Sequence, residues 1–141
     1  MDFSKITDIA VSGMRAQRTR MTVTASNIAN AQTTRTPEGG PYRRRDPVFQ
    51  PESVGSGFGS SLEKKLRAVE VSSIQKDSRD PITRYLPSHP DANDQGFVEF
   101  PNVNLVEEQA NLVGSSRAFQ ANLLVMQKVR GMAEALMRVG Q

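Results

Sequence analysis

The chain has 141 residues, of which 37% are hydrophobic and 6% aromatic, and it contains neither tryptophan nor cysteine. Its 18 basic and 15 acidic side chains give a net charge of +3. The lack of cysteine excludes disulfides, thiol catalysis and cysteine metal sites within these residues. The net charge is too small to argue for a nucleic-acid ligand on its own, and the length fits one ordinary domain.

No run in the sequence approaches the ~18 consecutive apolar residues that a membrane-spanning helix needs. The first residues, MDFSKITDIAVSGMRAQ, also lack a basic segment followed by an apolar stretch of ~7–15 residues. We therefore expect no membrane span and no Sec-type signal peptide. If the protein leaves the cytoplasm, we expect it to use another route.

An amphipathic pattern extends from about residue 4 to residue 30. Apolar or small side chains recur in steps of three and four, the spacing of one helix face. The pattern predicts a long helix that ends at Asn30, because asparagine can adopt the left-handed conformation that closes a helix. The predicted apolar face comprises Ile6, Ile9, Ala10, Gly13, Met14, Met21, Ala25, Ile28 and Ala29.

The middle of the chain is rich in residues that break helices. Prolines at 37, 41, 47 and 51, together with several glycines, exclude a helix over most of residues 31–61. Residues 54–61, rich in glycine and serine, are predicted to form a mobile loop. Short strands are predicted within 42–49, where Pro47 confines the strand to a sheet edge, and at 66–74, 82–86 and 96–100.

From Asn104 the helical period returns and lasts to the end of the sequence. Asn104 is a good N-cap with Glu107 at the third helical position, and Glu107 and Glu108 suit the positive helix N-terminus. The helix of about 35 residues would be roughly 50 Å long. Its predicted stripe has Leu105, Leu112, Phe119, Met126 and Ala133 at heptad spacing, partners four residues on at Gln109, Ser116, Leu123, Arg130 and Met137, and Val113, Leu124, Val129 and Leu136 as its flanks.

These elements predict a mainly α fold with a small β insert. Residues 1–30 and 104–141 would form a core of two paired, coiled-coil-like helices, and residues 31–103 would form the loop- and strand-rich insert. The insert is too small to cover so wide an apolar arc, so part of the arc is expected to be an association surface. Five of the six methionines lie on the two helices, where a flexible side chain suits adaptable packing.

Candidate catalytic and ligand-binding motifs are weak. His89 is the only histidine, and the turn Asp91–Gly96 lacks the closing glutamate of a calcium loop. Arg43–Arg45 could bind phosphates, but Asp46 follows directly, and a salt-bridging strand end fits this run better. No nucleophile motif or phosphate-binding loop is present. We therefore predict no enzyme activity, no metal and no cofactor.

The stretch ASNIAN at residues 25–30 has two asparagines at the end of the first helical pattern. They could cap the helix, bind a ligand or belong to a packing surface. No other polar constellation supports a ligand. Asn30 fits a cap, whereas Asn27 lies one turn earlier among small residues, where another backbone can approach and bond to its amide. The matching small, polar patch is QAN at residues 120–122.

ASNIAN resembles the ASN-[hydrophobic]-AN signature of the bacterial flagellar axial proteins, the rod, hook and hook-associated subunits. SSRAFQANLLVMQ at 115–127 resembles the SR-[aromatic]-QAN motif of the same family, at the other end of the chain. GGPYRRRDPVFQ at 39–50 and the run HPDANDQGFVEFPNV at 89–103 are similar to the proximal-rod subunits. Departures are small: Ile28 stands in place of a common leucine, and Phe97 and Phe119 in place of frequent tyrosines.

This resemblance implies a structural subunit of the proximal rod in the flagellar basal body, located in the periplasm. Such subunits are exported unfolded through the flagellar type III apparatus without a cleaved signal. Their terminal helices pair and pack around the central export channel, and the β insert projects outward to touch neighbours. The implied partners are other proximal and distal rod subunits, the membrane-ring adapter protein and the export apparatus, with self-association possible and no nucleic acid.

The motifs and the apolar stripes together predict an assembly interface, for which no cofactor is needed. It comprises Ile6, Ile9, Gly13, Met14, Met21, Ala25, Asn27, Ile28, Asn30, Leu105, Leu112, Ser116, Arg117, Phe119, Gln120, Asn122, Leu123, Met126, Val129 and Met137. The predicted contacts of the insert are Tyr42, Arg43, Phe97 and Phe100.

Three alternatives remain open at this point. A different flagellar rod subunit would share the helices but not the run at 87–103. A soluble coiled-coil adaptor or export chaperone would also expose amphipathic helices, but it would not need the β insert. A nucleic-acid binder using Arg43–Arg45 would show strong salt-dependent DNA binding.

Overall fold

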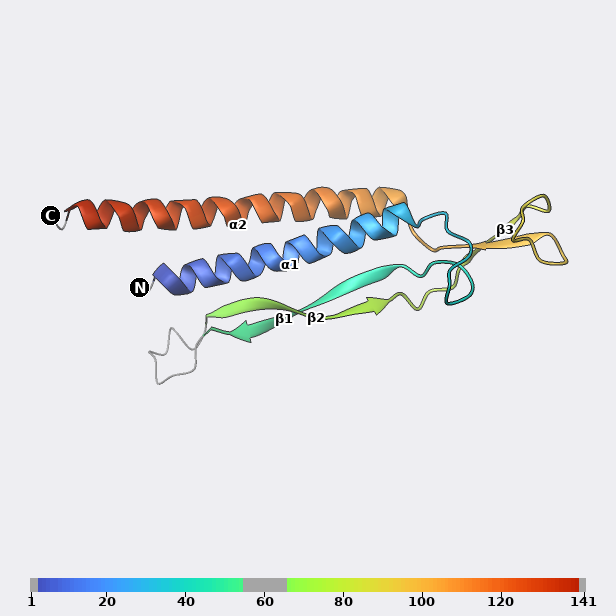
Figure 1. Ribbon diagram of the computed structural model, residues 1–141, viewed down its shortest axis with the longest axis horizontal. Coiled ribbons are helices and arrows are strands. Elements are labelled where there is room, and N and C mark those ends of the chain that lie inside the picture. Colours follow the sequence, from blue (N-terminus) through green and yellow to red (C-terminus); the bar gives the residue numbers. More distant parts are fainter. Residues whose placement is uncertain (1–2, 55–65, 140–141) are drawn as a thin grey trace.

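The computed structural model describes residues 3–54 and 66–139. Six elements follow one another: α1 (Phe3–Ala29), β1 (Arg45–Ser53), β2 (Arg67–Lys76), β3 (Ile82–Tyr85), β4 (Phe97–Phe100) and α2 (Leu105–Val139) (Figure 1). The predicted fold class is confirmed: two long terminal helices pack together, and a small β insert lies between them in the sequence. The predicted loop at 54–61 lies, except for Val54, outside the described residues.

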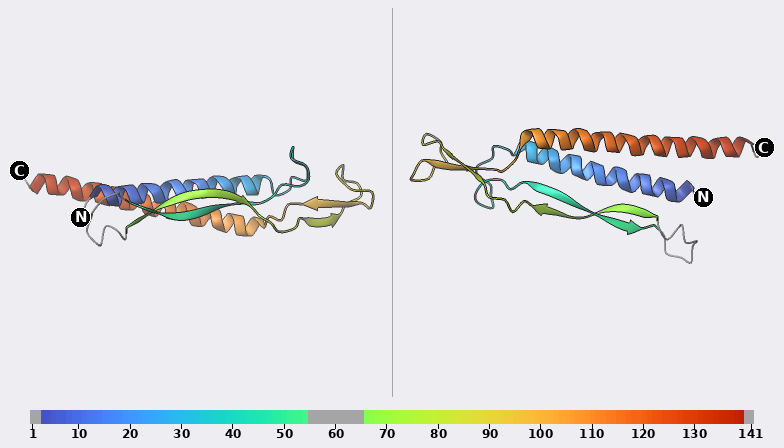
Figure 2. Two further views of the ribbon diagram at one scale, coloured as in Figure 1. Left: turned by 90° about the horizontal axis from the view of Figure 1, so that it is seen from below. Right: turned by 180° about the vertical axis from the view of Figure 1, so that it is seen from behind.

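The elements form an elongated molecule in which α1 lies between α2 and the β1–β2 hairpin (Figures 1 and 2). The helices run antiparallel, and the C-terminal end of α2 extends past the N-terminal end of α1. Within the insert, β1–β2 folds back along α1, whereas the β3–β4 hairpin extends beyond the opposite end of the helices. Neither described helix is long and apolar enough to cross a membrane.

The face of α2 that packs on α1 follows a heptad pattern. The predicted column containing Leu112, Phe119 and Met126 is confirmed, although Leu105 at its start is 42% exposed. The predicted partners four residues further on are wrong for the seam: Gln109, Arg130 and Met137 are exposed. The inner seam instead steps alternately by four and three residues, as two packed helices require, and comprises Glu108, Leu112, Ser115, Phe119, Asn122, Met126, Val129 and Ala133.

A close approach between the helices explains why the seam contains Asn122. A Cβ atom on Gly13 would lie 3.0 Å from Nδ2 of Asn122. The Asn122 amide donates to the carbonyl of Ala118 at 3.0 Å and so stays satisfied within α2. An added Cβ would be in tighter contact than is usual and would require the Asn122 side chain to shift by a few tenths of an ångström, so Gly13 and Asn122 mark a close approach of the two helices.

The β1–β2 hairpin is held on α1 by polar and aromatic contacts. Its antiparallel register runs from Arg45 opposite Lys76 to Ser53 opposite Arg67. The backbone N–H of Val69 donates to Oγ of Ser12 at 3.1 Å. The guanidinium carbon of Arg20 lies 4.4 Å from the centroid of the Phe49 ring, a distance at which a cation is attracted by the ring face. Both strands of this two-stranded sheet are edges, which is why it accommodates Pro47.

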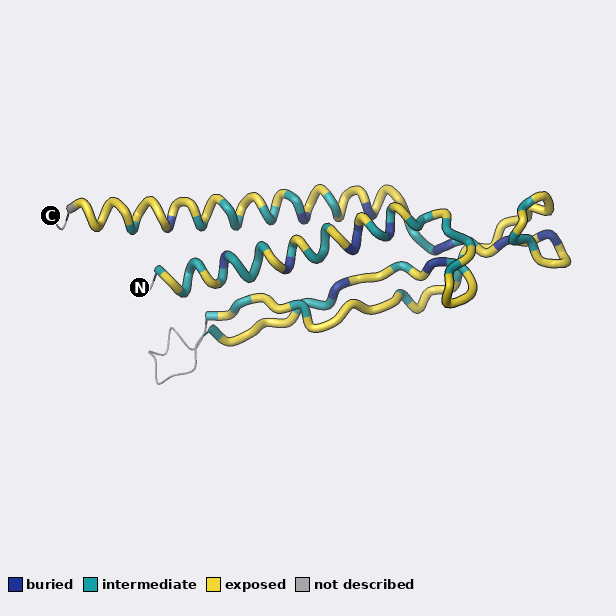
Figure 3. Tube along the Cα trace, in the orientation of Figure 1, coloured by how far each residue is buried: buried dark blue, intermediate teal, exposed yellow. Residues whose placement is uncertain are grey.

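Much of α2 is not covered by α1 (Figure 3): the side turned away from α1, and also the continuation of the inner seam at Leu136, beyond the N-terminal end of α1. Val106, Val113, Leu124 and Leu136 are 75%, 51%, 58% and 59% exposed. Spaced among them are Gly114 and Gly131, where an added Cβ would meet nothing within 4 Å. Glycine weakens a helix interior, and no contact with the described residues explains why glycine occupies these two positions. We call Val106, Val113, Leu124, Val125, Met132 and Leu136 the outer face.

Replacing Gly114 or Gly131 by alanine is expected to stabilise the free subunit by about 0.5–1 kcal/mol each, because alanine favours a helix and has open space at both positions. Urea unfolding of the purified variants measures this. Gly39→Ala is the matched control with the opposite sign, because Gly39 has a φ of +89°. A loss of stability in the two α2 variants would contradict the expectation.

Candidate functional site

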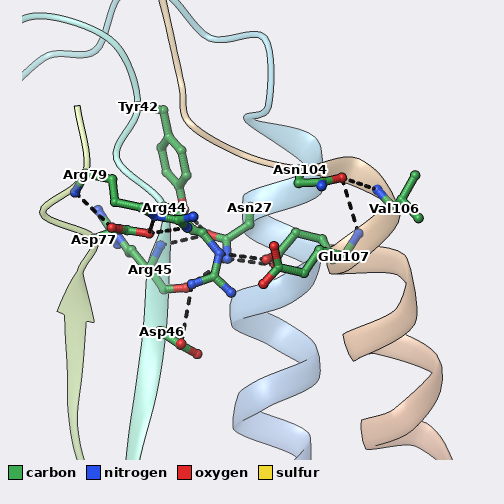
Figure 4. A network of polar contacts seen from close by, with 11 residues as sticks. Asn27, Tyr42, Arg44, Arg45, Asp46, Asp77, Arg79, Asn104, Val106 and Glu107 are labelled. Atoms are coloured by element: carbon green, nitrogen blue, oxygen red, sulfur yellow. Dashed lines mark hydrogen bonds and ion pairs between the residues drawn. The ribbon is translucent and has the colours of Figure 1, made fainter. Parts of the chain in front are cut away.

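A polar junction joins the end of α1, the start of β1 and the first turn of α2 at Asn27, which is 1% exposed (Figure 4). The Asn27 amide Nδ2 donates to the carbonyl of Arg45 at 2.8 Å and to Oε2 of Glu108 at 2.9 Å. Its Oδ1 accepts from the N–H of Arg45 and from the hydroxyl of Tyr42, both at 3.0 Å. Both donors and both lone pairs of the amide are therefore used.

Glu108 is the buried anion of this junction, with 1% of its surface exposed. Its Oε1 accepts from Nε of Arg44 at 2.7 Å, and the Arg44 side chain is 10% exposed. The Arg44 guanidinium also lies 3.3 Å from Asp46. Burial lowers the pKa of Arg44, but its hydrogen bond and attraction to Glu108, with a contribution from Asp46, outweigh that cost and raise the pKa above its usual value. The Arg44 guanidinium is therefore held between the carboxylates of Glu108 and Asp46.

A second ion pair, just after the end of β2, supports the junction. The N–H of Asp77 donates to the carbonyl of Arg44 at 2.7 Å. Nε and Nη2 of Arg79 donate to Oδ2 of Asp77 at 2.8 and 2.6 Å, and the Arg79 N–H donates to Oδ1. These side-chain and backbone hydrogen bonds lower the pKa of Asp77 from 3.8 to about 2. Asp77 therefore stays ionised far below neutral pH.

The three consecutive arginines are used inside the chain, which confirms the prediction of a salt-bridging strand end. Arg43 donates to the carbonyl of Arg79 at 2.8 Å. Arg44 pairs with Glu108, and the backbone of Arg45 pairs with Asn27. The Arg45 guanidinium carbon also lies 5.8 Å from the centroid of the Tyr42 ring.

The predicted helix ends are partly confirmed. Oδ1 of Asn104 accepts from the N–H groups of Val106 and Glu107 at 3.0 and 3.4 Å, so Asn104 is the N-cap of α2. Asn30 follows α1 as predicted, but no non-glycine residue in the described ranges has a positive φ. The predicted left-handed conformation of Asn30 is therefore wrong. Asn30 instead donates from Nδ2 to the carbonyl of Ser26 at 2.9 Å and satisfies a helix-end acceptor with its side chain.

Asn27 and Tyr42 were both predicted to make contacts with neighbouring subunits. Both are buried within the single chain, at 1% and 8% exposure, so in this conformation they offer no surface to a neighbour. Asn27 does bond to another backbone segment, as expected of it, but that segment is Arg45 of the same chain. The sequence did not reveal that Glu108 pairs with Arg44 and Asn27. Acidic residues are common in the first turn of a helix because they interact favourably with the helix dipole, so Glu108 gave no separate signal.

The β3–β4 hairpin carries the predicted insert contacts Phe97 and Phe100. The rings of Tyr85 and Phe97 meet edge to face with centroids 5.3 Å apart. The Phe100 ring lies 6.1 Å from His89 and 5.2 Å from the guanidinium carbon of Arg84. Arg43, another of the four predicted insert contacts, lies before β1 and is exposed.

The turn between β3 and β4 is rich in side-chain-to-backbone bonds. Oδ1 of Asn93 accepts from the N–H groups of Gln95 and Phe97 at 3.0 and 2.8 Å. The Asp91 carboxylate accepts from Thr34 at 2.7 Å and pairs with Arg35 at 2.5 Å. In the parts of the chain that the structure describes, no three His, Cys, Asp or Glu side chains converge to hold a metal.

Two family models match the chain at its helical ends. The model described as "Flagella basal body rod protein" matches residues 8–35, and that described as "Flagellar basal body rod FlgEFG protein C-terminal" matches residues 94–139. The flagellar basal-body rod protein FlgC of Borreliella burgdorferi is 39% identical, covering 99% of this chain and 97% of its own length. The chain belongs to the FlgC family of flagellar basal-body rod proteins.

Other FlgC proteins align over similar lengths. The Bacillus subtilis protein is 36% identical over 95% of both chains, and the Salmonella typhimurium protein is 36% identical over the whole of both. In this FlgC-family chain, the N-terminal match contains Asn27 and the C-terminal match contains Glu108, the two residues that bond to each other in the junction. The two matches also hold the Gly13–Asn122 contact.

The other predicted interface residues of this FlgC-family chain fall into three groups according to how far each is exposed. On the inner seam lie Leu112, Phe119, Asn122, Met126 and Val129. Half-buried on α1, or beside that seam, are Ile6, Ile9, Gly13, Met14, Met21, Ile28, Ser116 and Leu123. Ala25, Leu105, Arg117, Gln120 and Met137 are exposed.

Proposed function

We propose that this chain is a structural subunit of the flagellar proximal rod. It polymerises through its terminal helices around the export channel and transmits torque, and it has no enzymatic activity. The observation that carries the proposal is the outer face of α2, whose large apolar side chains are uncovered in the single chain. An exposed apolar surface of this extent is typical of a protein–protein contact.

The N-terminal end of α1 adds a second apolar surface. A cleft of about 510 Å³ lies between Phe3 and Thr7 of α1 and Leu123, Met126 and Val129 of α2. It continues the inner seam toward the part of α2 that α1 does not cover. A neighbouring helix seated here would extend the same heptad packing.

The same proposal includes the location and the partners of the subunit. It reaches the periplasm through the type III export apparatus without a cleaved signal. It contacts other proximal and distal rod subunits, the membrane-ring adapter protein and the export apparatus, it can self-associate, it does not span a membrane, and it binds no nucleic acid. The two-part division into residues 1–30 with 104–141 and residues 31–103 assigns polymerisation to the helices and outward contacts to the insert.

The relatives favour this role over the alternatives. The proteins that align over nearly the full chain are named FlgC, which favours the FlgC role over that of another rod subunit. A coiled-coil adaptor or chaperone would leave the β insert without a purpose. Arg43–Arg45, the candidate nucleic-acid contact, are engaged within the chain.

The test is complementation of a strain that lacks this gene. Leu124→Asp/Leu136→Asp places two charges on the outer face, where both side chains are more than half exposed. We expect the variant to be folded and exported but to restore neither hooks nor motility. Phe119→Asp is unsuitable because Phe119 lies on the inner seam with α1, so the charge would disturb the subunit itself.

The matched control is Gln109→Asp/Asn111→Asp, which adds the same charge at exposed polar positions of α2. This control is expected to restore swimming. A deletion strain that swims with normal hooks, or full complementation by the Leu124→Asp/Leu136→Asp variant, would overturn the proposal.

A further inference from the structure

The two ends of the molecule carry surfaces that complement each other. At one end, Tyr85 and Phe97, which are paired on one face of the β3–β4 hairpin, and the adjoining Leu86 are 64%, 39% and 41% exposed; we call these three residues the tip patch. At the other end, Met132, Leu136 and Met137 of α2 are 57%, 59% and 68% exposed; we call these three the tail patch.

The tip patch is rigid although it is exposed. Tyr85 and Phe97 are partners in the β3–β4 register, and their rings meet edge to face. Gly96 has a φ of +81°, and a Cβ on it would lie 2.8 Å from Cε2 of Tyr85. The N–H of Leu86 donates to the carbonyl of Gly96 at 2.9 Å. An aromatic side chain that is already fixed loses little conformational entropy on binding.

The tail patch has the chemistry that suits such a surface. It lies on the part of α2 that extends past the N-terminal end of α1 (Figures 1 and 3). Methionine is flexible and polarizable, and its sulfur makes favourable contacts with aromatic rings. A helix with two exposed methionines and a leucine can therefore adapt to the fixed rings of the tip patch.

Charge favours the same pairing. Residues 82–99 of the hairpin contain three acidic side chains, Asp91, Asp94 and Glu99, and one basic side chain, Arg84, a net charge of −2, with Asp91 paired to Arg35. Residues 128–138 around the tail patch contain three basic side chains, Lys128, Arg130 and Arg138, and one acidic side chain, Glu134, a net charge of +2. Opposite potentials steer two surfaces together and disfavour the contact of like ends.

We propose that the tip patch of one subunit binds the tail patch of a second copy of this chain. The two patches lie at opposite ends of the molecule, so they cannot meet within one subunit (Figure 1). The contact joins two different surfaces and is therefore heterologous, which leaves one free patch at each end for further copies. The inference rests on the proposed function, because it supplies one specific contact between subunits that assemble.

Cysteine cross-linking tests the contact directly, because the chain has no native cysteine. Thr83→Cys lies beside the tip patch and Ala135→Cys beside the tail patch, and both positions are exposed and outside the patches. When the two purified single-cysteine variants are mixed with a bifunctional maleimide, we expect a Thr83–Ala135 product. Ser73→Cys, exposed on β2, replaces Thr83→Cys as the matched control and should give little product with Ala135→Cys.

Charge exchange distinguishes a specific contact from random collision. Arg130→Glu/Arg138→Glu in the Ala135→Cys chain should reduce the yield several-fold. Asp94→Arg/Glu99→Arg in the Thr83→Cys chain should restore it. Tyr85→Ser removes one aromatic ring of the tip patch and should also reduce the yield. Gly96, whose positive φ shapes the turn, stays unchanged in this variant.

Three outcomes would overturn the proposal: no Thr83–Ala135 product, a yield that ignores both charge reversals, or a dominant Ala135–Ala135 product that indicates side-by-side helices. In motile cells, cross-linking of Thr83→Cys to a different rod subunit alone would also overturn the second copy as occupant. If the chain restores motility but forms no Thr83–Ala135 product, the head-to-tail contact fails while the proposed function stands. If the product forms but the chain restores no motility, the proposed function fails instead.

Discussion

Glu108→Ala is expected to lower the free energy of unfolding by about 3–5 kcal/mol, because it leaves a buried charge without its partner. The Arg44 guanidinium is 10% exposed and would lose the carboxylate 2.7 Å from its Nε. One of the two amide donors of Asn27, itself 1% exposed, would lose its acceptor at the same time. Urea unfolding of the purified subunit, followed by circular dichroism, measures the change.

Two variants make this result specific to the junction. Glu107→Ala removes a carboxylate from the neighbouring, exposed position of the same turn and should change stability by less than about 0.5 kcal/mol. Glu108→Leu/Arg44→Met replaces both charges by apolar groups and should recover much of the loss, as replacing whole buried ion pairs often does. Equal stabilities for Glu108→Ala and Glu107→Ala would show that the junction contributes little.

Gly13→Leu is expected to separate the two helices and to lower the free energy of unfolding by about 1–3 kcal/mol through overpacking. Even the first added carbon would lie 3.0 Å from Nδ2 and 3.2 Å from Cγ of Asn122. Asn122 could give way only by turning out of its bond to the Ala118 carbonyl. The better helix propensity of leucine offsets part of the loss, by about 1 kcal/mol at most.

Gly114→Leu provides the comparison, since Gly114 lies on the same helix pair but has no atom within 4 Å of an added Cβ. That variant should be at least as stable as the wild type. Disulfide formation between cysteines placed across the helices would report the changed spacing in Gly13→Leu independently. Similar stabilities for the two leucine variants would contradict a close contact at Gly13.

The helices and strands were largely predictable because their signals are local. The apolar period predicts a helix over residues 4–30, and α1 spans Phe3–Ala29. Asn104 begins the second helix as its capping pattern indicates. The predicted strands at 66–74, 82–86 and 96–100 correspond to β2, β3 and β4. Each depends on the preferences of neighbouring residues, which a single sequence contains.

The inner seam and the junction were not predictable from periodicity. From Leu112, a heptad pattern can continue through Ser116 and Leu123 or through Ser115 and Asn122, and the first choice is more apolar. The structure takes the second, because Gly13 makes room for Asn122 and because Glu108 must reach Asn27. These are contacts between distant segments, and the sequence pattern around each residue does not specify its partner.

The bond between Asn27 and Glu108 joins residues 81 positions apart, and this separation orders the events of folding. The strands of the β1–β2 and β3–β4 hairpins are separated by 13 and 11 residues and can pair early, whereas the helix pair must close a loop that contains the whole insert. Until α2 arrives, one side of α1 has no partner. The paired helices, and with them the surfaces that other chains bind, are therefore completed last.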